Sequence, residues 1–137
     1  AEGVLLGTRF LATTESPLPD SYKQAICRSD GHDTLLTELP DVIAGQVWPG
    51  AFARTQRNAF VQEWLGREGE VRLRRAELLR RVQRAREEGD VDHASLLIGQ
   101  DAGLIERVED AGEIVQRIVR EAEDILRRRS AEALSAE

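Results

Sequence analysis

The sequence predicts an α/β chain that is mostly α-helical, with one short buried strand near its start. Apolar residues between positions 111 and 126 recur at intervals of three and one, the pattern of one helix face. Residues 4–6 form an apolar run between Gly3 and Gly7, typical of a strand buried on both faces of a parallel sheet. Aromatic residues make up only 4%, so the core must be built mainly from aliphatic side chains, which suits packed helices.

Residues 1–30 are expected to form a strand followed by helices. The strand at residues 4–6 needs partners; residues 33–37 could pair with it, but we favour partners that lie outside this chain. A helical turn is predicted at residues 8–14, and after the prolines at 17 and 19 a helix at residues 20–28.

Residues 31–110 are expected to form a helical excursion. The predicted elements are a strand-like segment at 35–37, an irregular stretch at 40–50, and helices at 51–65, 68–88, 92–98 and 102–106. Gly66 and Gly89 stand where left-handed helix ends are expected.

Residues 111–137 are predicted to be an amphipathic helix with a frayed tail. Asp110 followed by Glu113 resembles a capping box, and the helix should run to about residue 128 and fray from Ser130. Its apolar face should bury four side chains, namely Ile114, Val115, Ile118 and Ile125.

Composition limits the function classes. A length of 137 residues allows one core, and the absence of methionine suggests a piece of a longer protein. A net charge of −6 disfavours a surface made for nucleic acid. No run approaches the roughly 18 apolar residues of a membrane span, and a single cysteine excludes an intramolecular disulfide. We therefore expect a cytoplasmic protein that binds neither nucleic acid nor membrane; its oligomeric state stays open.

Residues 3–10, Gly-Val-Leu-Leu-Gly-Thr-Arg-Phe, lead from the predicted strand through a glycine into a helical turn. Gly7 has no Cβ to keep an anion from the backbone, the next amides lack intrahelical partners, and Thr8 adds a hydroxyl donor. This pattern fits a phosphate site, but it also fits a plain turn between a strand and a helix.

The segments GVLLGTRFLATTES and SYKQAI resemble the last barrel strand and following helices of the FMN-dependent nitronate monooxygenase family. GQDAGLIERVEDAGEIVQRIVREAEDIL is similar to that family's closing segment, and QRNAFVQEW to the Arg-Asn helix before it. The resemblance spans residues 3–126. Residues 47–51, Val-Trp-Pro-Gly-Ala, depart from the basic Gly-Arg-Pro-Ala type segment expected there.

The resemblance implies the C-terminal part of a TIM (β/α)8 barrel, with the FMN phosphate bound after the last strands. It places Leu5, Leu6, Gly7 and Thr8 at the cofactor and implies no catalytic residue in this segment, because the family's histidine base lies earlier in the barrel. The implied reaction oxidises alkyl nitronates with dioxygen to carbonyl products and nitrite. The related flavin-dependent enoyl-acyl-carrier-protein reductase is an alternative, and a non-enzymatic helical interaction module is an alternative of another class.

Five other residues could carry chemistry. Arg9 could contact a phosphate or pair with a carboxylate, with equal weight. Gln100 could reach the flavin edge but more simply completes a turn, and His32 and His93 are expected at the surface rather than as bases. Cys27 is expected as a small buried hydrophobe.

Residues 67–90 hold eight arginines and six acidic residues. The alternation of charges favours ion pairs along a solvated helix face over nucleic-acid binding. No metal site and no dinucleotide glycine fingerprint is expected.

Overall fold

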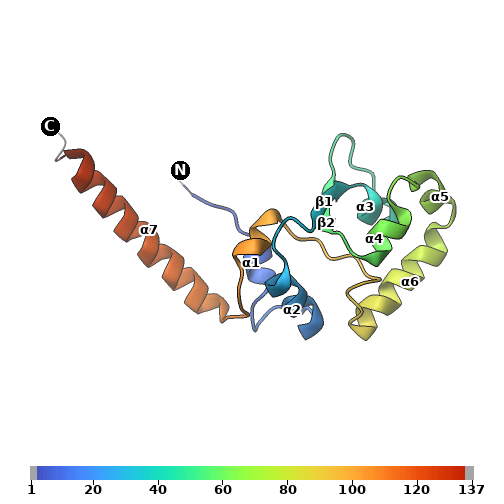
Figure 1. The fold of residues 1–137 in the computed structure, drawn as a ribbon, viewed down its shortest axis with the longest axis horizontal. Helices are drawn as coiled ribbons and strands as arrows, with labels where there is room; N and C mark the ends of the chain where they lie inside the picture. Colours follow the sequence, from blue (N-terminus) through green and yellow to red (C-terminus); the bar gives the residue numbers. More distant parts are fainter. Residues whose placement is uncertain (1–2, 135–137) are drawn as a thin grey trace.

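The computed structural model describes residues 3–134, and they are mostly helical, as predicted. The elements in order are α1 (Thr8–Leu11), α2 (Asp20–Arg28), β1 (Thr34–Thr37), α3 (Leu39–Ala44), β2 (Ala53–Gln56), α4 (Ala59–Trp64), α5 (Glu68–Leu73), α6 (Arg75–Glu88), the 3-10 helix η1 (Gln100–Leu104) and α7 (Ala111–Leu134). Figure 1 shows one group formed by α1, α2 and η1, a second formed by the two strands and α3–α6, and α7 extending away from both.

The predicted strand at residues 4–6 is not formed. No strand is assigned before β1 in the part of the chain described, and the side chains of Val4 and Leu5 are 74% and 100% exposed. A strand exists only through hydrogen bonds to a neighbour, and no other described segment pairs with these residues. Their exposure agrees with the expectation that their partners lie outside this chain.

The two strands form a short antiparallel sheet, in which Thr34 lies opposite Gln56 and Thr37 opposite Ala53. The prediction of a helix from residue 51 is therefore wrong at its start, because pairing with β1 overrides the weak helical pattern. Helix α4 begins only after Asn58, whose Oδ1 accepts a hydrogen bond from the Val61 amide at 3.0 Å.

Three other local predictions are corrected. The stretch at 40–50, expected to be irregular, contains most of α3; Pro40 fits its first turn, where no amide is needed, and Gly45 ends it at φ 77°. The single helix expected at 68–88 is divided at Arg74 into α5 and α6, and both pack on α3. Residues 92–98 form a turn and an extended segment instead of a helix.

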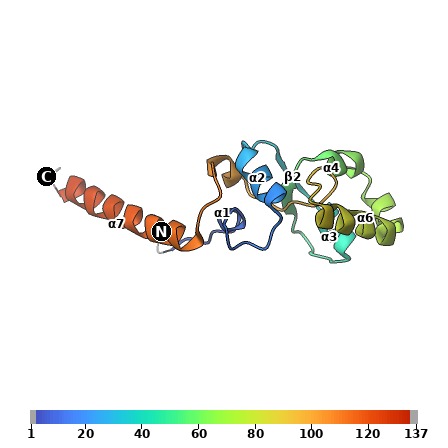
Figure 2. The same cartoon turned by 90° about the horizontal axis from the view of Figure 1, so that it is seen from below.

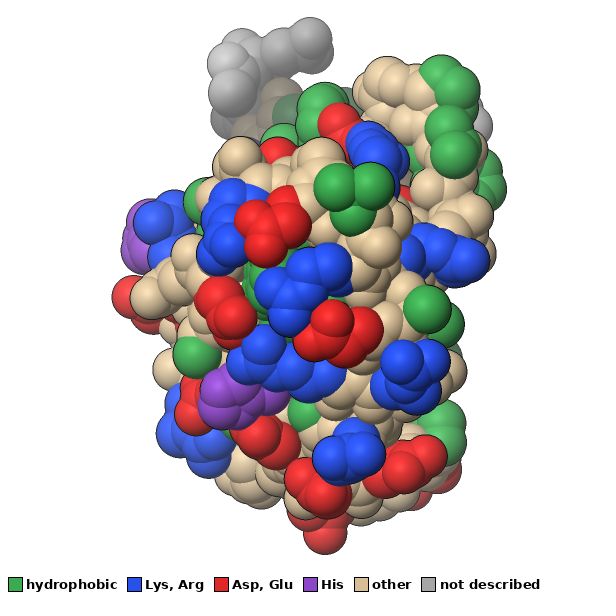
Figure 3. All heavy atoms as spheres, turned by 90° about the vertical axis from the view of Figure 1, so that its right-hand side faces the viewer, with side chains coloured by type: hydrophobic (Ala, Val, Ile, Leu, Met, Phe, Trp, Pro, Cys, Tyr) green, Lys and Arg blue, Asp and Glu red, His purple; other side chains and the backbone are tan. Residues whose placement is uncertain are grey.

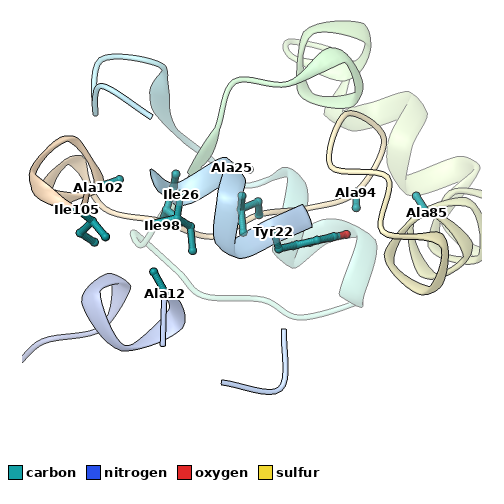
Figure 4. Packing of buried hydrophobic residues seen from close by; sticks show 10 residues of the cluster. Ala12, Tyr22, Ala25, Ile26, Ala85, Ala94, Ile98, Ala102 and Ile105 are labelled. Carbon is teal, nitrogen blue, oxygen red and sulfur yellow. The ribbon is translucent and has the colours of Figure 1, made fainter. Parts of the chain in front are cut away.

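Two hydrophobic clusters hold the chain together. Helices α3–α6 form the second cluster, whose larger side chains are Leu39, Ile43, Phe60, Trp64 and Leu78. The first cluster joins α1, α2 and η1 to the segment before η1 and to Ala85 of α6, and Figure 4 shows Ile26 and Ile98 lying together in it. Ile98 is 2% exposed, so the extended segment before η1 is fixed in this core.

Helix α7 is confirmed, but its predicted burial is mostly wrong. Ile114 is fully buried and Ile118 is half-buried, whereas Val115 and Ile125 are 49% and 48% exposed. Figures 1 and 2 show the reason, since α7 leaves the rest of the protein after its first turns. The helix continues through Ser130 to Leu134.

The start of α7 is tied to the N-terminal part of the chain. Asp110 Oδ1 accepts from the Glu113 amide at 3.0 Å, as the predicted cap requires, and the Glu15 carboxylate accepts from the Ala111 amide at 3.1 Å. Glu109 receives two hydrogen bonds from Arg117 at 2.8 and 3.0 Å, which, with further contacts, lower the pKa of Glu109 to about 2. Among residues 3–134, no helix combines the length and the apolar character needed to cross a membrane.

Candidate functional site

A hollow of about 280 Å³ opens where the start of α1, strand β2 and the segment before η1 meet. Its lining consists of Gly7, Thr8, Arg54 and Gly99, which offer polar groups or bare backbone, and of the apolar residues Leu11, Leu97 and Ile98. Among residues 3–134, one cation and no acidic residue line the hollow. Three segments that are far apart in the sequence therefore meet at a site suited to an anion.

Thr8 joins the first of these segments to the third. It is 7% exposed, and its Oγ1 accepts a hydrogen bond from the Gly99 amide at 2.8 Å. A hydroxyl has two lone pairs and one proton, so Thr8 still has its O–H to donate to a ligand. A Cβ at residue 99 would press on the Asp101 carboxylate and lie 3.3 Å from Thr8 Oγ1, so glycine permits this close approach.

Strand β2 is fastened to the same third segment. Thr55 is fully buried, and its Oγ1 donates to the Leu96 carbonyl at 2.9 Å. The Gln56 amide donates to that carbonyl at 2.9 Å, and Thr55 forms an isolated antiparallel bridge with Leu97. These contacts fix the backbone on both sides of the hollow, and with it the position of Arg54.

Arg54 supplies the positive charge of the hollow. Its Nη1 donates to Thr34 Oγ1 at 3.1 Å, and Thr34 in turn donates to the Gly31 carbonyl at 2.9 Å. Within residues 3–134 no carboxylate forms an ion pair with this guanidinium. A guanidinium has five N–H donors, so most of those on Arg54 remain available to a ligand.

The predicted cofactor residues divide into two groups. Gly7 and Thr8 line the hollow, and no atom lies within 4 Å of the position that a Cβ on Gly7 would take. Leu5 and Leu6 do not line it; Leu5 is fully exposed and Leu6 is 37% exposed. The structure thus brings only the second half of the predicted motif to this site.

Arg9, although next to Thr8, points elsewhere. Its guanidinium donates to the carbonyls of Ala12 at 2.7 Å and Arg107 at 2.9 Å, and it lies 3.6 Å from the Glu109 carboxylate. Of the two roles predicted for Arg9, the structure therefore shows the pairing with a carboxylate.

The other candidates lie away from the hollow. Gln100 begins η1 and is exposed, and His32 is exposed in its loop, as expected. Cys27 is half-buried beside the first cluster, and burial raises the pKa of its thiol. His93 Nδ1 lies 2.8 Å from Asp90 Oδ2, and this hydrogen bond is the main cause of the lowered pKa of Asp90.

Helices α5 and α6, which hold the arginine-rich stretch, lie on the face shown in Figure 3, where basic and acidic side chains alternate. Arg67 pairs with Glu70, Arg74 with Glu77, and Arg81 with Glu63, at 2.7 to 2.9 Å. This confirms the predicted ion pairing. In the part of the chain that the structure covers, no group of three or more His, Cys, Asp or Glu residues could hold a metal ion.

The sequence profile of the family described as nitronate monooxygenase matches residues 1–121. The chain belongs to the nitronate monooxygenase family. It is similar to nitronate monooxygenase npaC of Metarhizium robertsii, with 31% identity over 92% of this chain and 36% of that protein. It is also similar to a probable nitronate monooxygenase of Staphylococcus saprophyticus, with 29% identity over 93% of this chain and 34% of that protein.

Among solved structures, FabK from Thermotoga maritima matches with a TM-score of 0.75 and 30% identity, over 96% of this chain and 40% of that chain. The chain spans about a third of the length of the curated relatives that it matches.

Sequence reasoning did not identify Arg54 or Gly99 as site residues. Arg54 lies in a stretch expected to be helical, and only the pairing of β2 with β1 places it at the hollow. Gly99 directly follows the helix expected at residues 92–98, where a glycine fits a plain helix end. Neither carries a local signal that points to a ligand.

Proposed function

We propose that this chain is the C-terminal part of an FMN-dependent nitronate monooxygenase, in which it holds the phosphoryl end of the cofactor. In this proposal residues 4–6 are the last strand of a TIM barrel, and Leu5 and Leu6 approach the cofactor through their backbone. Gly7 and Thr8 follow at the carboxyl end of that strand, where barrel enzymes place phosphate sites. The observation that carries the proposal is the hollow that joins these two residues to Arg54.

The residues present fit a phosphoryl group. The hollow has a hydroxyl donor, a guanidinium that has no acidic partner among residues 3–134, and an open approach to the backbone at residue 7. Its volume of about 280 Å³ is just below the roughly 300–1,000 Å³ of complete ligand pockets, so it suits one end of a flavin mononucleotide rather than the whole molecule.

When bound, the flavin supplies the redox chemistry of the reaction. The residues of this chain would bind and orient it: Thr8 and Arg54 would offer donors to the phosphoryl oxygens, and the absence of a side chain on Gly7 would leave room for one of these oxygens to hydrogen-bond with the backbone. Leu11, Leu97 and Ile98 provide the apolar part of the lining. The resemblance to the family implies that the proton alpha to the nitro group is taken by a histidine earlier in the barrel, outside this chain.

The test uses the full-length protein that contains this segment. We expect a yellow protein that releases FMN on denaturation and that converts alkyl nitronates to nitrite while consuming dioxygen. A colourless, stable protein that does not take up FMN would contradict the proposal and favour the helical interaction module.

A second candidate is a flavin-dependent enoyl-acyl-carrier-protein reductase, favoured by the similarity to FabK. It is distinguished by its need for a nicotinamide reductant. Oxidation of NADH or NADPH that depends on an enoyl thioester, without nitrite formation from nitronates, would select this function.

A further inference from the structure

We propose that Arg54 makes the site selective for the phosphorylated flavin, by pairing its guanidinium with the phosphoryl group of FMN and so discriminating against riboflavin. This inference rests on the proposed function and extends it to a residue that the cofactor motif does not contain.

The first argument is position. Arg54 lies in β2, at the register position opposite Leu36, and lines the same hollow as Gly7 and Thr8. The neighbouring Thr55 and Gln56 both bond to Leu96, and Gly99 bonds to Thr8, so hydrogen bonds connect each segment to the next. The backbone that carries the guanidinium is thereby held beside Thr8.

The second argument is orientation. Thr34 Oγ1 uses its proton on the Gly31 carbonyl and so meets the Arg54 Nη1 as an acceptor. This contact occupies one of the five donors and restrains the side chain. A guanidinium presents its remaining donors in a planar fork that matches two phosphoryl oxygens at once, which an ammonium group does not.

The third argument is charge. The other arginine near this motif, Arg9, is committed to two carbonyls and to Glu109. Arg54 has no carboxylate partner within the described residues, and no acidic residue lines the hollow. This half-buried cation has no counter-ion in the described part of the chain, and it lines the same hollow as a hydroxyl that can still donate, so an anionic ligand fits the site. FMN carries a negatively charged phosphoryl group and riboflavin does not, so Arg54 should favour FMN.

The experiment compares two flavins that differ only in the phosphoryl group. FMN and riboflavin are titrated into the flavin-free full-length protein, and binding is followed by quenching of flavin fluorescence. The variants are Arg54→Gln, which removes the charge, and Arg54→Lys, which keeps the charge and loses the fork. Arg57→Gln is the matched control, since it removes an exposed arginine three positions away that does not line the hollow.

We expect Arg54→Gln to weaken FMN binding about tenfold and to leave riboflavin binding unchanged. Tenfold is the low end for the loss of a hydrogen bond to a charged group, and it applies because the arginine is only half-buried. Arg54→Lys should lose less, and Arg57→Gln should resemble the wild type for both flavins. The FMN preference of the wild type should also shrink as salt concentration rises.

Two outcomes overturn the inference. An equal loss for FMN and riboflavin in Arg54→Gln means that the residue supports the fold and not the phosphoryl group, and unchanged binding of both means that it does not reach the ligand. In both cases the wild type still binds FMN, so the proposed function stands. A wild type that binds neither flavin refutes the proposed function itself, before any variant is considered.

Discussion

Thr8 can be tested by replacing it with valine, which keeps the shape of the side chain and removes the hydroxyl. Two effects follow from its position. The Gly99 amide loses its acceptor at 2.8 Å, which costs about 1–3 kcal/mol of stability for an amide left without a partner. A bound phosphoryl group loses a donor, which costs about 1.5–3 kcal/mol or roughly a ten- to hundredfold loss of FMN affinity.

The assay separates these effects by measuring two quantities on the full-length protein. Flavin titration gives the FMN affinity, and urea unfolding of the flavin-free protein gives the free energy of unfolding. Thr8→Ser is the matched control, because it retains a hydroxyl that can accept from Gly99 and donate to the ligand. We expect the serine variant to stay close to the wild type in both measurements and the valine variant to fall in both.

One result would refute the reasoning. If Thr8→Val lowers stability but leaves FMN affinity unchanged, the hydroxyl serves only to fasten the Gly99 segment, and the assignment of Thr8 to the phosphoryl group is wrong.

Three further predictions concern other parts of the chain. Gly7→Val should abolish FMN retention, because the valine side chain would fill the room that glycine leaves for a phosphoryl oxygen. Far-ultraviolet circular dichroism should stay unchanged, since φ is −108° and no atom of a non-neighbouring residue lies within 4 Å of the added Cβ. Retained FMN would contradict this prediction. Asn58→Ala should lower the free energy of unfolding by about 2–4 kcal/mol, since a helix cap and two donated hydrogen bonds are lost. Asn58→Asp should lower it by at least as much, because aspartate keeps the cap but cannot donate to the two carbonyls. The pKa of Glu109 is lowered from 4.5 to about 2, chiefly by Arg117, so the ion pair should stabilise the start of α7 above pH 4.5 and lose this effect as pH falls toward 2. Hydrogen exchange of the first amides of α7 should show this loss beginning at higher pH in Arg117→Gln than in the wild type. Equal exchange profiles would contradict a stabilising role of the ion pair.

Elements with strong local signals were predictable from the sequence. Helix α2 starts directly after Pro19 and carries an acidic residue in its first turn, and α7 starts with the Asp110 cap. Gly66 and Gly89 adopt the left-handed conformation expected of them, with φ of 79° and 72°. In each case the determining interactions lie within a few residues along the chain.

The errors have a common cause in long-range contacts. Strand β2 forms because it pairs with β1 and because the Leu96 carbonyl accepts the Gln56 amide, and a local pattern at residues 51–56 cannot report either contact. The burial predicted for Ile125 failed because a helix period shows which residues share a face but not how far that face stays in contact with the protein.

The difference between local signals and long-range contacts also decides what could be predicted of the site. Gly7 and Thr8 could be proposed from the sequence because the features that suit them to a phosphate lie in one short segment. Arg54 could not, because it comes to line the same hollow only through contacts across β2 and the segment before η1. A ligand held by three segments also stabilises the contacts between them, since binding to the folded form alone adds about 2.7 kcal/mol at a hundred times the dissociation constant. The cofactor we propose is therefore also expected to hold the start of α1 against β2 and against the segment before η1, to which the hydrogen bond from the Gly99 amide already joins Thr8.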